Sequence, residues 1–453
     1  MRTTTLTAVG LLGLALLTPA YSASAAAETC RGEAATIVGT GQPVRGTEGR
    51  DVIVAGTSSQ VDAYGGDDLI CLSRGVDAYY VQEIDAGPGN DTVDTTAAST
   101  DVSTRTALGP GADTFVGGAA QDIVHAGTAP EPRDVVAQPG SDVDGDRVGT
   151  GNGDDTVHSG SSGGADHDVV DLGAGDDALF LGTSQLAGDA AFDGGDGEDP
   201  LRFGVGSEEV TFDQGTGTFT SAAGTAALTS FASVTVDAGP GKVHYRGTLG
   251  DDSLTVRTDG SPVLDLATAA GKDLVVLEPA TIGTGSTIDL GGGHDKLVAA
   301  RRNGSLELDL GFHRRLVVAR EKVADVDEVE DAFLMSPQVT MVGSNADNAL
   351  TFNGCKGTLS GGHGRDFLAR IDDYVFESYL FGCRTTTTMR GGPDKDHLSG
   401  GLGRDRLRGE GGNDRLEGTS GSDVLVGGGG RDRADGGLGR DRCVAEREKH
   451  CER

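Results

Sequence analysis

The sequence predicts an all-β protein built as a parallel β-solenoid, and three observations lead to this fold class. Nonapeptides follow one another without gaps from Gly391, and looser copies recur upstream. Glycine is the commonest residue, with 75 copies in 453 residues, while aromatic residues make up only 4% and tryptophan is absent. Many thin cores shared by stacked coils need fewer bulky side chains than one large core. We therefore expect a β-roll at the C-terminus and looser β-helix-like coils upstream.

The C-terminal repeats share a fixed pattern of glycine, aspartate and apolar residues. Residues 391–444 divide into GGPDKDHLS, GGLGRDRLR, GEGGNDRLE, GTSGSDVLV, GGGGRDRAD and GGLGRDRCV. The sixth position is always aspartate: Asp396, Asp405, Asp414, Asp423, Asp432 and Asp441. The eighth position is apolar or small: Leu398, Leu407, Leu416, Leu425, Ala434 and Cys443.

Each nonapeptide divides into a turn and a strand. The first six residues are predicted to form a turn, because glycine tolerates the positive φ that aims carbonyl groups inward. Inward carbonyls and one carboxylate make an all-oxygen cage, which suits calcium and offers no soft ligand to a transition metal. The last three residues are predicted to form a short strand, whose central side chain enters the core while its neighbours, such as Arg406, Arg408 and Arg415, face water.

Two nonapeptides make one coil of strand, turn, strand and turn. Turns one coil apart then stack, so the six aspartates fall into two columns. One column holds Asp396, Asp414 and Asp432, and the other holds Asp405, Asp423 and Asp441. Calcium is expected between successive turns of a column, and it is expected to supply much of the folding free energy of this glycine-rich segment.

The pattern G-G-x-G-x-D-x-U-x resembles the hemolysin-type calcium-binding (RTX) repeat of secreted bacterial proteins. The resemblance covers residues 391–444 and implies a parallel β-roll in which sixth-position aspartates and turn backbone groups hold calcium. The residues that it implicates are Asp396, Asp405, Asp414, Asp423, Asp432, Asp441, Gly400, Gly409, Gly418 and Gly427. Many members carry a C-terminal export signal, whereas this chain begins with a different kind of signal.

Looser copies extend the pattern toward the N-terminus. Their sixth positions add the metal-ligand candidates Asp51, Asp68, Asp91, Asp113, Asp155, Asp177, Asp199 and Asp366, with Asp252 and Asp295 in weaker copies. The spacing between these aspartates is often close to twenty residues, which suits solenoid coils with insertions. Two interpretations stay open for each aspartate: it binds metal with a neighbouring turn, or it only closes its own turn.

The chain divides into five segments. Residues 1–27 combine Arg2, an apolar run and small A-x-A residues, which indicates a secretory signal peptide and hence a secreted, extracellular protein. Residues 28–205 are predicted to be degenerate repeats, 206–340 a β-rich region with sparse repeats, 341–390 a coil with an insertion, and 391–453 the β-roll with a C-terminal cap. Residues 320–334 suit a short helix or a strand equally.

Six cysteines are expected to pair in an exported protein. Proximity in the sequence favours Cys30–Cys71, Cys355–Cys383 and Cys443–Cys451. The last pair would pin the tail over the final coil, since a solenoid needs a terminal cap. Free buried thiols are the alternative, and zinc is disfavoured because no C-x-x-C pair or histidine cluster accompanies the cysteines.

The formal net charge of −33 constrains the partners. An acidic surface disfavours nucleic acid and anionic lipid, and it suits calcium or a polycation. No segment after the signal is apolar and long enough for a membrane span. A cell-surface or polysaccharide partner is compatible with the sequence, which names none.

The sequence offers little support for catalysis. It contains neither H-E-x-x-H nor a phosphate-cradling G-x-x-x-x-G-K-[ST] motif. The favoured function is therefore a non-catalytic calcium-binding protein. The alternative is a polysaccharide lyase or epimerase on a β-helix, for which the strongest basic cluster is Arg301, Arg302, His313, Arg314 and Arg315.

Overall fold

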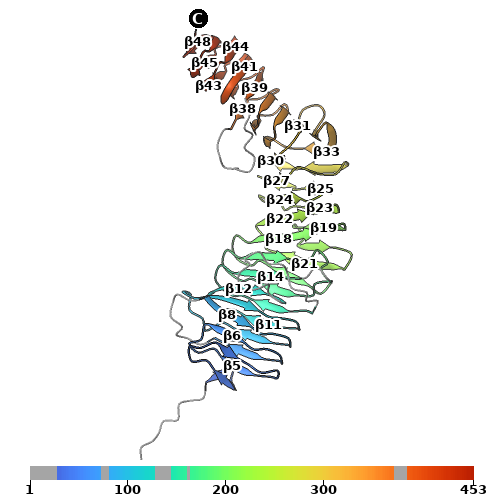
Figure 1. Cartoon of the computed structure of the whole chain (residues 1–453). Helices are drawn as coiled ribbons and strands as arrows, with labels where there is room; N and C mark the ends of the chain where they lie inside the picture. The colour runs from blue at the N-terminus through green and yellow to red at the C-terminus, as the bar shows by residue number, and fades with distance from the viewer. Residues whose placement is uncertain (1–27, 73–80, 128–143, 161–163, 372–384, 453) are drawn as a thin grey trace, which may run out of the picture.

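The computed structural model describes residues 28–72, 81–127, 144–160, 164–371 and 385–452. Figure 1 shows an elongated stack of short strands that winds from the N-terminal to the C-terminal end. Every regular element of the described residues is a β-strand. The expected β-solenoid is therefore confirmed, with the β-roll formed by the C-terminal repeats.

One face of the solenoid, here called sheet 2, is parallel from end to end. Its strands, in spatial order, are β4 (Val44–Arg45), β6 (Gln60–Asp62), β8 (Val81–Asp85), β10 (Ser103–Ala107), β12 (Gln121–His125), β14 (Thr156–Ser159), β16 (Ala178–Leu181), β18 (Pro200–Val205), β22 (Ser233–Ala238), β24 (Ser253–Thr258), β27 (Leu274–Glu278), β30 (Lys296–Ala300), β34 (Asp331–Met335), β36 (Ala349–Asn353), β38 (Phe367–Arg370), β40 (His397–Ser399), β42 (Arg415–Glu417), β45 (Arg433–Asp435) and β48 (Arg447–Lys449). This sheet crosses every boundary between the predicted segments of the described chain.

The opposite face, sheet 1, is parallel except at two places. Its strands, in spatial order, are β3 (Ile37–Val38), β5 (Val52–Val54), β7 (Leu69–Cys71), β9 (Thr92–Asp94), β11 (Thr114–Val116), β13 (Arg147–Gly149), β15 (Val169–Asp171), β17 (Ala191–Asp193), β21 (Thr225–Thr229), β20 (Thr218–Thr220), β19 (Glu209–Asp213), β23 (Lys242–Arg246), β25 (Val263–Ala267), β28 (Ser286–Asp289), β33 (Glu321–Asp327), β32 (Arg315–Val318), β31 (Ser305–Asp309), β35 (Gln338–Val342), β37 (Lys356–Ser360), β39 (Thr386–Gly392), β41 (Leu402–Gly412), β44 (Val424–Gly430) and β47 (Arg442–Val444). Short pairings in the turns join β26 (Ala270–Gly271) to β29 (Gly292–Gly293), and join β43 (Ser420–Gly421) to β46 (Leu438–Gly439).

Two antiparallel meanders lengthen sheet 1 relative to sheet 2. While sheet 2 advances by one strand, from β18 to β22, sheet 1 contains three strands: β19, β20 and β21. The same happens while sheet 2 advances from β30 to β34, where sheet 1 contains β31, β32 and β33. Each meander adds two strand spacings, or about 9.5 Å, to one face. In Figure 1 the solenoid axis changes direction near β31 and β33, with the longer sheet on the outer side.

The core lies between the two sheets as one continuous row of buried side chains, from Val44 to Ala434. The eighth residue of each C-terminal repeat points into it, as predicted, and Leu398, Leu407 and Leu416 are fully buried. Where the first meander widens the interior, aromatic rings fill it. Phe203 and Phe219 pack edge to face with ring centroids 5.2 Å apart.

The segments with few repeats also form strands. Residues 206–340, predicted as a β-rich region with sparse repeats, contain strands of both sheets and both meanders. Residues 320–334, for which helix and strand were equally expected, form β33 and the start of β34. No helix of the described residues is long and apolar enough to cross a membrane.

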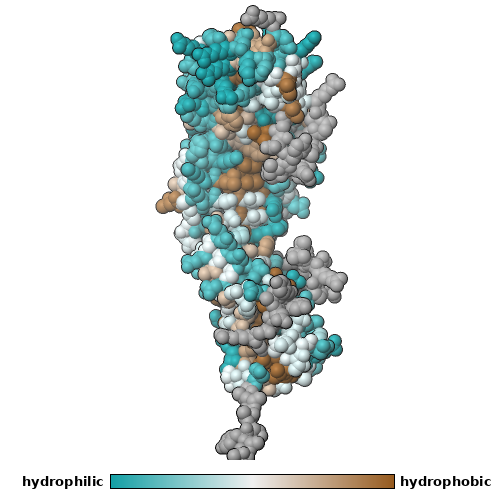
Figure 2. All heavy atoms as spheres, turned by 90° about the vertical axis from the view of Figure 1, so that its left-hand side faces the viewer, coloured by the Kyte–Doolittle hydropathy of each residue, from teal (hydrophilic) through white to brown (hydrophobic). Residues whose placement is uncertain are grey.

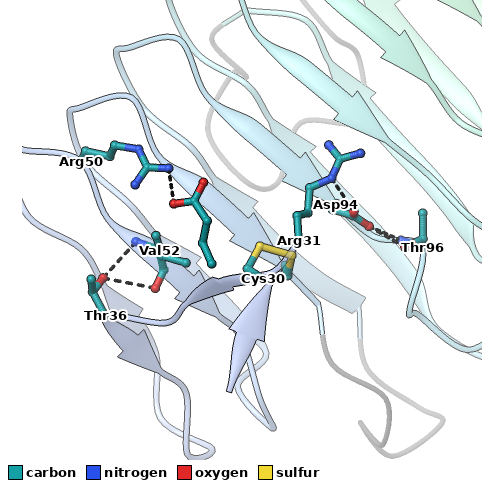
Figure 3. The surroundings of a disulfide bond; sticks show 9 residues. Cys30, Arg31, Thr36, Arg50, Val52, Asp94 and Thr96 are labelled. Carbon is teal, nitrogen blue, oxygen red and sulfur yellow. Dashed lines mark hydrogen bonds and ion pairs between the residues drawn. A yellow bond between two sulfur atoms is a disulfide. The ribbon is translucent and has the colours of Figure 1, made fainter. Parts of the chain in front are cut away.

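A disulfide pins the N-terminal end. Strands β1 (Thr29–Cys30) and β2 (Glu33–Ala34) form an antiparallel hairpin, and Cys30 is bonded to Cys71 at the end of β7, as predicted. Figure 3 shows this bond beside two ion pairs, Arg31–Asp94 and Arg50–Glu33. These contacts tie the hairpin to the first coils and cover the open end of the stack.

The outer face of sheet 2 carries one apolar cluster. Val298, Ala300 and Met335 lie there on β30 and β34. Figure 2 shows apolar surface midway along this side of the molecule, between hydrophilic regions. The C-terminal repeats instead present charged residues outward, and Arg406, Arg408 and Arg415 are exposed, as predicted.

Candidate metal centre

The sixth-position aspartates of the C-terminal repeats stand in two columns. Strands β40, β42 and β45 pair in register, with His397 opposite Arg415 and Arg415 opposite Arg433. The residues immediately before them, Asp396, Asp414 and Asp432, therefore stack one above another. The register of β41, β44 and β47 aligns Asp405, Asp423 and Asp441 in the same way along sheet 1.

A hydrogen-bond ladder runs along each column. The amide of Asp396 donates to Oδ1 of Asp414 at 2.9 Å, and the amide of Asp414 donates to Oδ1 of Asp432 at 3.0 Å. The other column repeats the contact from Asp405 to Asp423 and on to Asp441, each at 2.9 Å. One oxygen of each accepting carboxylate thus binds the backbone of the preceding coil, 18 residues earlier.

The second carboxylate oxygen of the ladder has no protein donor among the described residues. It is buried in Asp396, Asp414, Asp423, Asp432 and Asp441, whose exposed fractions are only 1–2%. An ionised carboxylate that loses water without gaining a partner costs several kcal/mol. These oxygens therefore fit a cation bound between the turns.

The electrostatics of the columns lead to the same conclusion. Burial raises the pKa of Asp396 and of Asp423 to about 7, and repulsion from the neighbouring carboxylates adds to this rise. The pKa of Asp414 rises to about 6 for the same reasons. A divalent cation supplies the opposite charge that favours the ionised form. Calcium binding would therefore remove the electrostatic cost that burial imposes on these carboxylates.

The glycines of the repeat let the carboxylate and the neighbouring coils approach closely. A Cβ added to Gly409 would lie 2.1 Å from Oδ2 of Asp414, and one added to Gly421 would lie 1.4 Å from the carbonyl oxygen of Gly403 in the preceding coil. The other first-position glycines, Gly400, Gly418 and Gly427, likewise lie against their own aspartates, with added-Cβ distances of 2.2–2.6 Å. All four predicted glycines therefore border the oxygen cage.

The turn imposes its conformation even where glycine is absent. Glu410 and Thr419 occupy second positions and have φ values of 78° and 77°. A non-glycine residue in this left-handed region costs on the order of 1 kcal/mol. Its presence in both turns shows that the backbone path is specified by the whole repeat rather than by glycine at one position.

The ladder continues upstream through the looser copies. Along sheet 1, the amide of Asp51 donates to Asp68, Asp68 to Asp91, and Asp91 to Asp113, each at 2.7 Å. Along sheet 2, the donors run from Asp155 to Asp177 at 2.7 Å and from Asp177 to Asp199 at 2.8 Å. The amide of Asp366 donates to Asp396 at 2.9 Å, so this residue extends the C-terminal column by one coil. Buried Oδ2 atoms without a donor among the described residues belong to Asp68, Asp91, Asp155, Asp177, Asp199, Asp273, Asp295 and Asp366.

Some turns satisfy both oxygens from within the protein. Oδ2 of Asp51 accepts the amide of Thr47 at 2.7 Å, and Oδ2 of Asp252 accepts the amide of Thr248 at 2.8 Å. Asn348 replaces aspartate altogether and accepts the amide of Ser344 at 2.7 Å. In these closed turns the amide of the second-position residue supplies the donor that the open turns lack. Asp51, a predicted ligand, thus differs from its neighbours.

Four further aspartates of the ladder escaped the sequence analysis: Asp122, Asp146, Asp168 and Asp273. The amide of Asp122 donates to Asp155 at 2.7 Å across 33 residues, and that of Asp146 to Asp168 at 2.9 Å. The signal for Asp122 was present in GGAAQDIVH, which keeps the aspartate and apolar positions but has alanine at the fourth position. A search that relaxed that glycine would have found it.

The cage depends on the backbone rather than on clustered side chains. Within the described ranges, no group of three or more histidine, cysteine, aspartate or glutamate side chains gathers around one point. Each turn contributes one carboxylate, and the next turn presents a backbone carbonyl nearby: a Cβ added to Gly409 would lie 2.1 Å from Oδ2 of Asp414 and 2.6 Å from the carbonyl oxygen of Gly427. Such a donor set, made only of oxygen, is the set that calcium prefers.

The second predicted disulfide closes the tail, since Cys443 is bonded to Cys451 with Cα atoms 5.8 Å apart. Cys355 is also disulfide-bonded, and its predicted partner Cys383 lies outside the described residues. The insertion predicted within residues 341–390 falls partly in the same undescribed range.

The basic cluster considered for an enzyme is divided between two places. Arg301 and Arg302 line a surface hollow next to Glu278 on the sheet 2 side. Arg315 is the first residue of β32 in sheet 1 and Arg314 precedes it; they pair with Glu307 at 2.9 Å and with Asp327 at 2.8 Å, respectively. Arg314 and Arg315 are not among the residues that line the hollow beside Arg301 and Arg302.

Comparison with known families agrees with this geometry. The family model of the RTX calcium-binding nonapeptide repeat matches four copies, within residues 109–128, 390–425 and 408–443. The first match includes Asp113 and Asp122, and the other two include both C-terminal columns. No curated protein matches the chain significantly.

Proposed function

We propose that this protein, which carries RTX calcium-binding repeats, is a secreted, non-catalytic solenoid whose C-terminal roll becomes ordered when calcium binds between its turns. One observation carries the proposal: successive turns place buried carboxylate oxygens, without protein donors in the described residues, at regular intervals along two columns. The chain supplies the cage and the buried charge, and calcium supplies the neutralising charge.

Sites in the roll would be formed by the residues already predicted. Asp396, Asp414 and Asp432 would hold ions along one column, with the carbonyl groups of the adjoining turns. Asp405, Asp423 and Asp441 would do so along the other. Upstream, the open turns of sheets 1 and 2 are proposed as further sites, whereas the closed turns at Asp51 and Asp252 are proposed to be structural.

Calcium dependence is expected to be greatest in the roll. Each nonapeptide there adds only one leucine-sized side chain to the core, while the central coils also bury aromatic rings. A segment that buries little apolar surface per ordered residue needs another source of stability. Bound ions supply it by stabilising the folded state alone.

The proposed extracellular setting rests on two features. The N-terminal residues 1–27 have the pattern of a secretory signal peptide. The disulfides Cys30–Cys71 and Cys443–Cys451 fit an oxidising compartment. The non-catalytic role is supported by the division of the basic cluster between two faces.

Calcium titration of the full-length protein tests the proposal. Isothermal calorimetry should show saturable binding, and hydrogen exchange should show that residues 391–444 gain protection as the sites fill. Magnesium at the same concentration should give less protection, because it demands stricter octahedral geometry. Equal protection of this segment in a chelator and in millimolar calcium would rule the proposal out.

A further inference from the structure

The C-terminal tail continues both ladders with glutamate. The amide of Asp432 donates to Oε2 of Glu446 at 2.8 Å, and the amide of Asp441 donates to Oε2 of Glu452. These are the contacts that the amides of Asp396 and Asp405 make with the aspartates of the next coil. The two glutamates therefore occupy the places where a further coil would put its aspartates.

The backbone of the tail follows the solenoid register. Strand β48 pairs in parallel with β45, with Arg447 opposite Arg433, so Glu446 directly follows Asp432 along its column. The amide of Arg447 donates to the carbonyl of Asp432 at 3.1 Å, as the amide of Arg433 does to Asp414 at 2.9 Å. The tail is thus a shortened last coil.

Two further contacts hold the tail in this register. The Cys443–Cys451 disulfide links β47 to the residue next to Glu452. Asp435 binds Lys449 at 3.2 Å and His450 at 2.8 Å. The position of both glutamates therefore depends on the closed tail.

The aspartates that face the tail lack one partner each. Asp432 and Asp441 are 1% and 2% exposed, and the Oδ2 atom of each has no donor among the described residues. A neutral amide oxygen, such as that of asparagine or glutamine, could accept the two ladder amides equally well. Instead, each column ends in a glutamate, which adds a negative charge beside the buried carboxylate of the last aspartate. Two such charges favour a cation between the glutamate and the aspartate.

We propose that Glu446 and Glu452 are terminal calcium ligands, so that the tail adds one ion-binding interval to each column and the Cys443–Cys451 disulfide strengthens both intervals. This inference rests on the proposed calcium-binding function. It assigns two residues that the nonapeptide pattern does not contain. It also couples calcium affinity to the redox state of the tail.

The test replaces both glutamates by glutamine in the full-length protein. E446Q/E452Q keeps an oxygen acceptor for each ladder amide and removes only the charge. Calorimetric titration with calcium should show that two of the ions bound by the wild type are lost or bind at least about tenfold more weakly. The matched control is E448Q, which removes one charge from the same tail, where Glu448 contacts the amide of Ala445 rather than a ladder amide.

A second variant tests the role of the disulfide. C443A/C451A retains both glutamates but releases the tail, and it should weaken the same two ions while leaving the total number at saturation unchanged. If E446Q/E452Q binds as many ions as the wild type, with equal affinities, the inference is wrong. If the wild type itself binds no calcium, the proposed function fails instead, so the two failures are distinguishable.

Discussion

Replacement of Asp414 by asparagine is expected to favour the ordered roll in a chelator and to disfavour it in calcium. Asparagine keeps an oxygen for the amide of Asp396, which the native Oδ1 accepts at 2.9 Å. It removes the charge from the buried Oδ2, which has no donor among the described residues. The substitution therefore separates the structural role of the ladder oxygen from the proposed metal-binding role.

The gain in the chelator follows from the cost of the buried charge. Burial raises the pKa of Asp414 from its ordinary value of 3.8 to about 6. Because the folded state disfavours the ionised form, this cost is present above the folded pKa and disappears below the unfolded one. The difference corresponds to about 3 kcal/mol at neutral pH, which structural relaxation around the charge reduces to about 1–2 kcal/mol.

The loss in calcium follows from the position of Asp414 between two intervals of its column. One interval lies toward Asp396 and the other toward Asp432. At a hundredfold excess over the dissociation constant, each ion contributes about 2.7 kcal/mol, so loss of both costs about 5 kcal/mol. The net change in calcium is thus opposite in sign to the change in the chelator.

Urea unfolding followed by circular dichroism measures both effects, with hydrogen exchange to assign them to the roll. D325N is a suitable control, because Asp325 lies in the second meander with 56% of its side chain exposed. This control should change little in either condition. A D414N protein that is destabilised equally with and without calcium would refute the assignment of an unpartnered metal-binding oxygen.

Three further predictions concern other parts of the fold. Gly409→Ala should weaken calcium binding in one column at least about tenfold, because the added Cβ would lie 2.1 Å from Oδ2 of Asp414. The control is Gly49→Ala, whose added Cβ has no atom within 4 Å, and it should leave the calcium binding measured by calorimetry unchanged. Burial lowers the pKa of His125 and His158 to about 4. As the pH falls from 6.5 toward 4, these histidines therefore become protonated in the unfolded chain but not in the folded protein. The free energy of unfolding should fall in that pH window by up to about 1.4 kcal/mol per pH unit for each histidine. Thermal melts at successive pH values should show a smaller loss of stability for H125F/H158F than for the wild type. Reduction of the N-terminal disulfide, which closes 41 residues, should cost about 4 kcal/mol and raise hydrogen exchange in the first coils only.

The sequence predicts the C-terminal roll well because its period is constant. With 18 residues between successive ladder partners, the column of every aspartate follows from counting. The apolar eighth residue then has one available direction, and Leu407 and Leu425 are fully buried as expected. Local pattern and tertiary register coincide in this segment.

Upstream, register cannot be counted in this way because the coils differ in length. Ladder partners there are separated by 17 residues at Asp51–Asp68, 23 at Asp68–Asp91, and 33 at Asp122–Asp155. The partner of an aspartate is then fixed by strand pairing, not by the motif. The ladder partner of an upstream aspartate therefore does not follow from counting, whereas Asp122 itself was missed because its repeat lacks the fourth-position glycine.

The two meanders and the closed turns are invisible to the repeat pattern for different reasons. Alternating polar and apolar residues predict a strand equally in a parallel or an antiparallel sheet, so the reversals at β20 and β32 leave no mark in the sequence. A threonine at the second position has two outcomes. Thr47 donates to its aspartate, whereas Thr419 adopts a φ of 77° and leaves Asp423 open.

Two residues without a carboxylate, Ala232 and Asn348, interrupt the column of aspartates along sheet 2 and divide it into separate groups of charges, here called units, although the apolar core is continuous. Ala232 precedes β22 where the pattern would place an aspartate, so the carboxylates that end at Asp199 have no successor in the next coil. Asn348 keeps the ladder contact to Asp366 at 3.0 Å but carries no charge, and its own oxygen is taken by Ser344. Ions bound on either side of such a residue would share no carboxylate. Because neighbouring intervals within a unit do share one, we expect binding to be coupled inside each unit and independent between units, while the unbroken sheets connect the units mechanically.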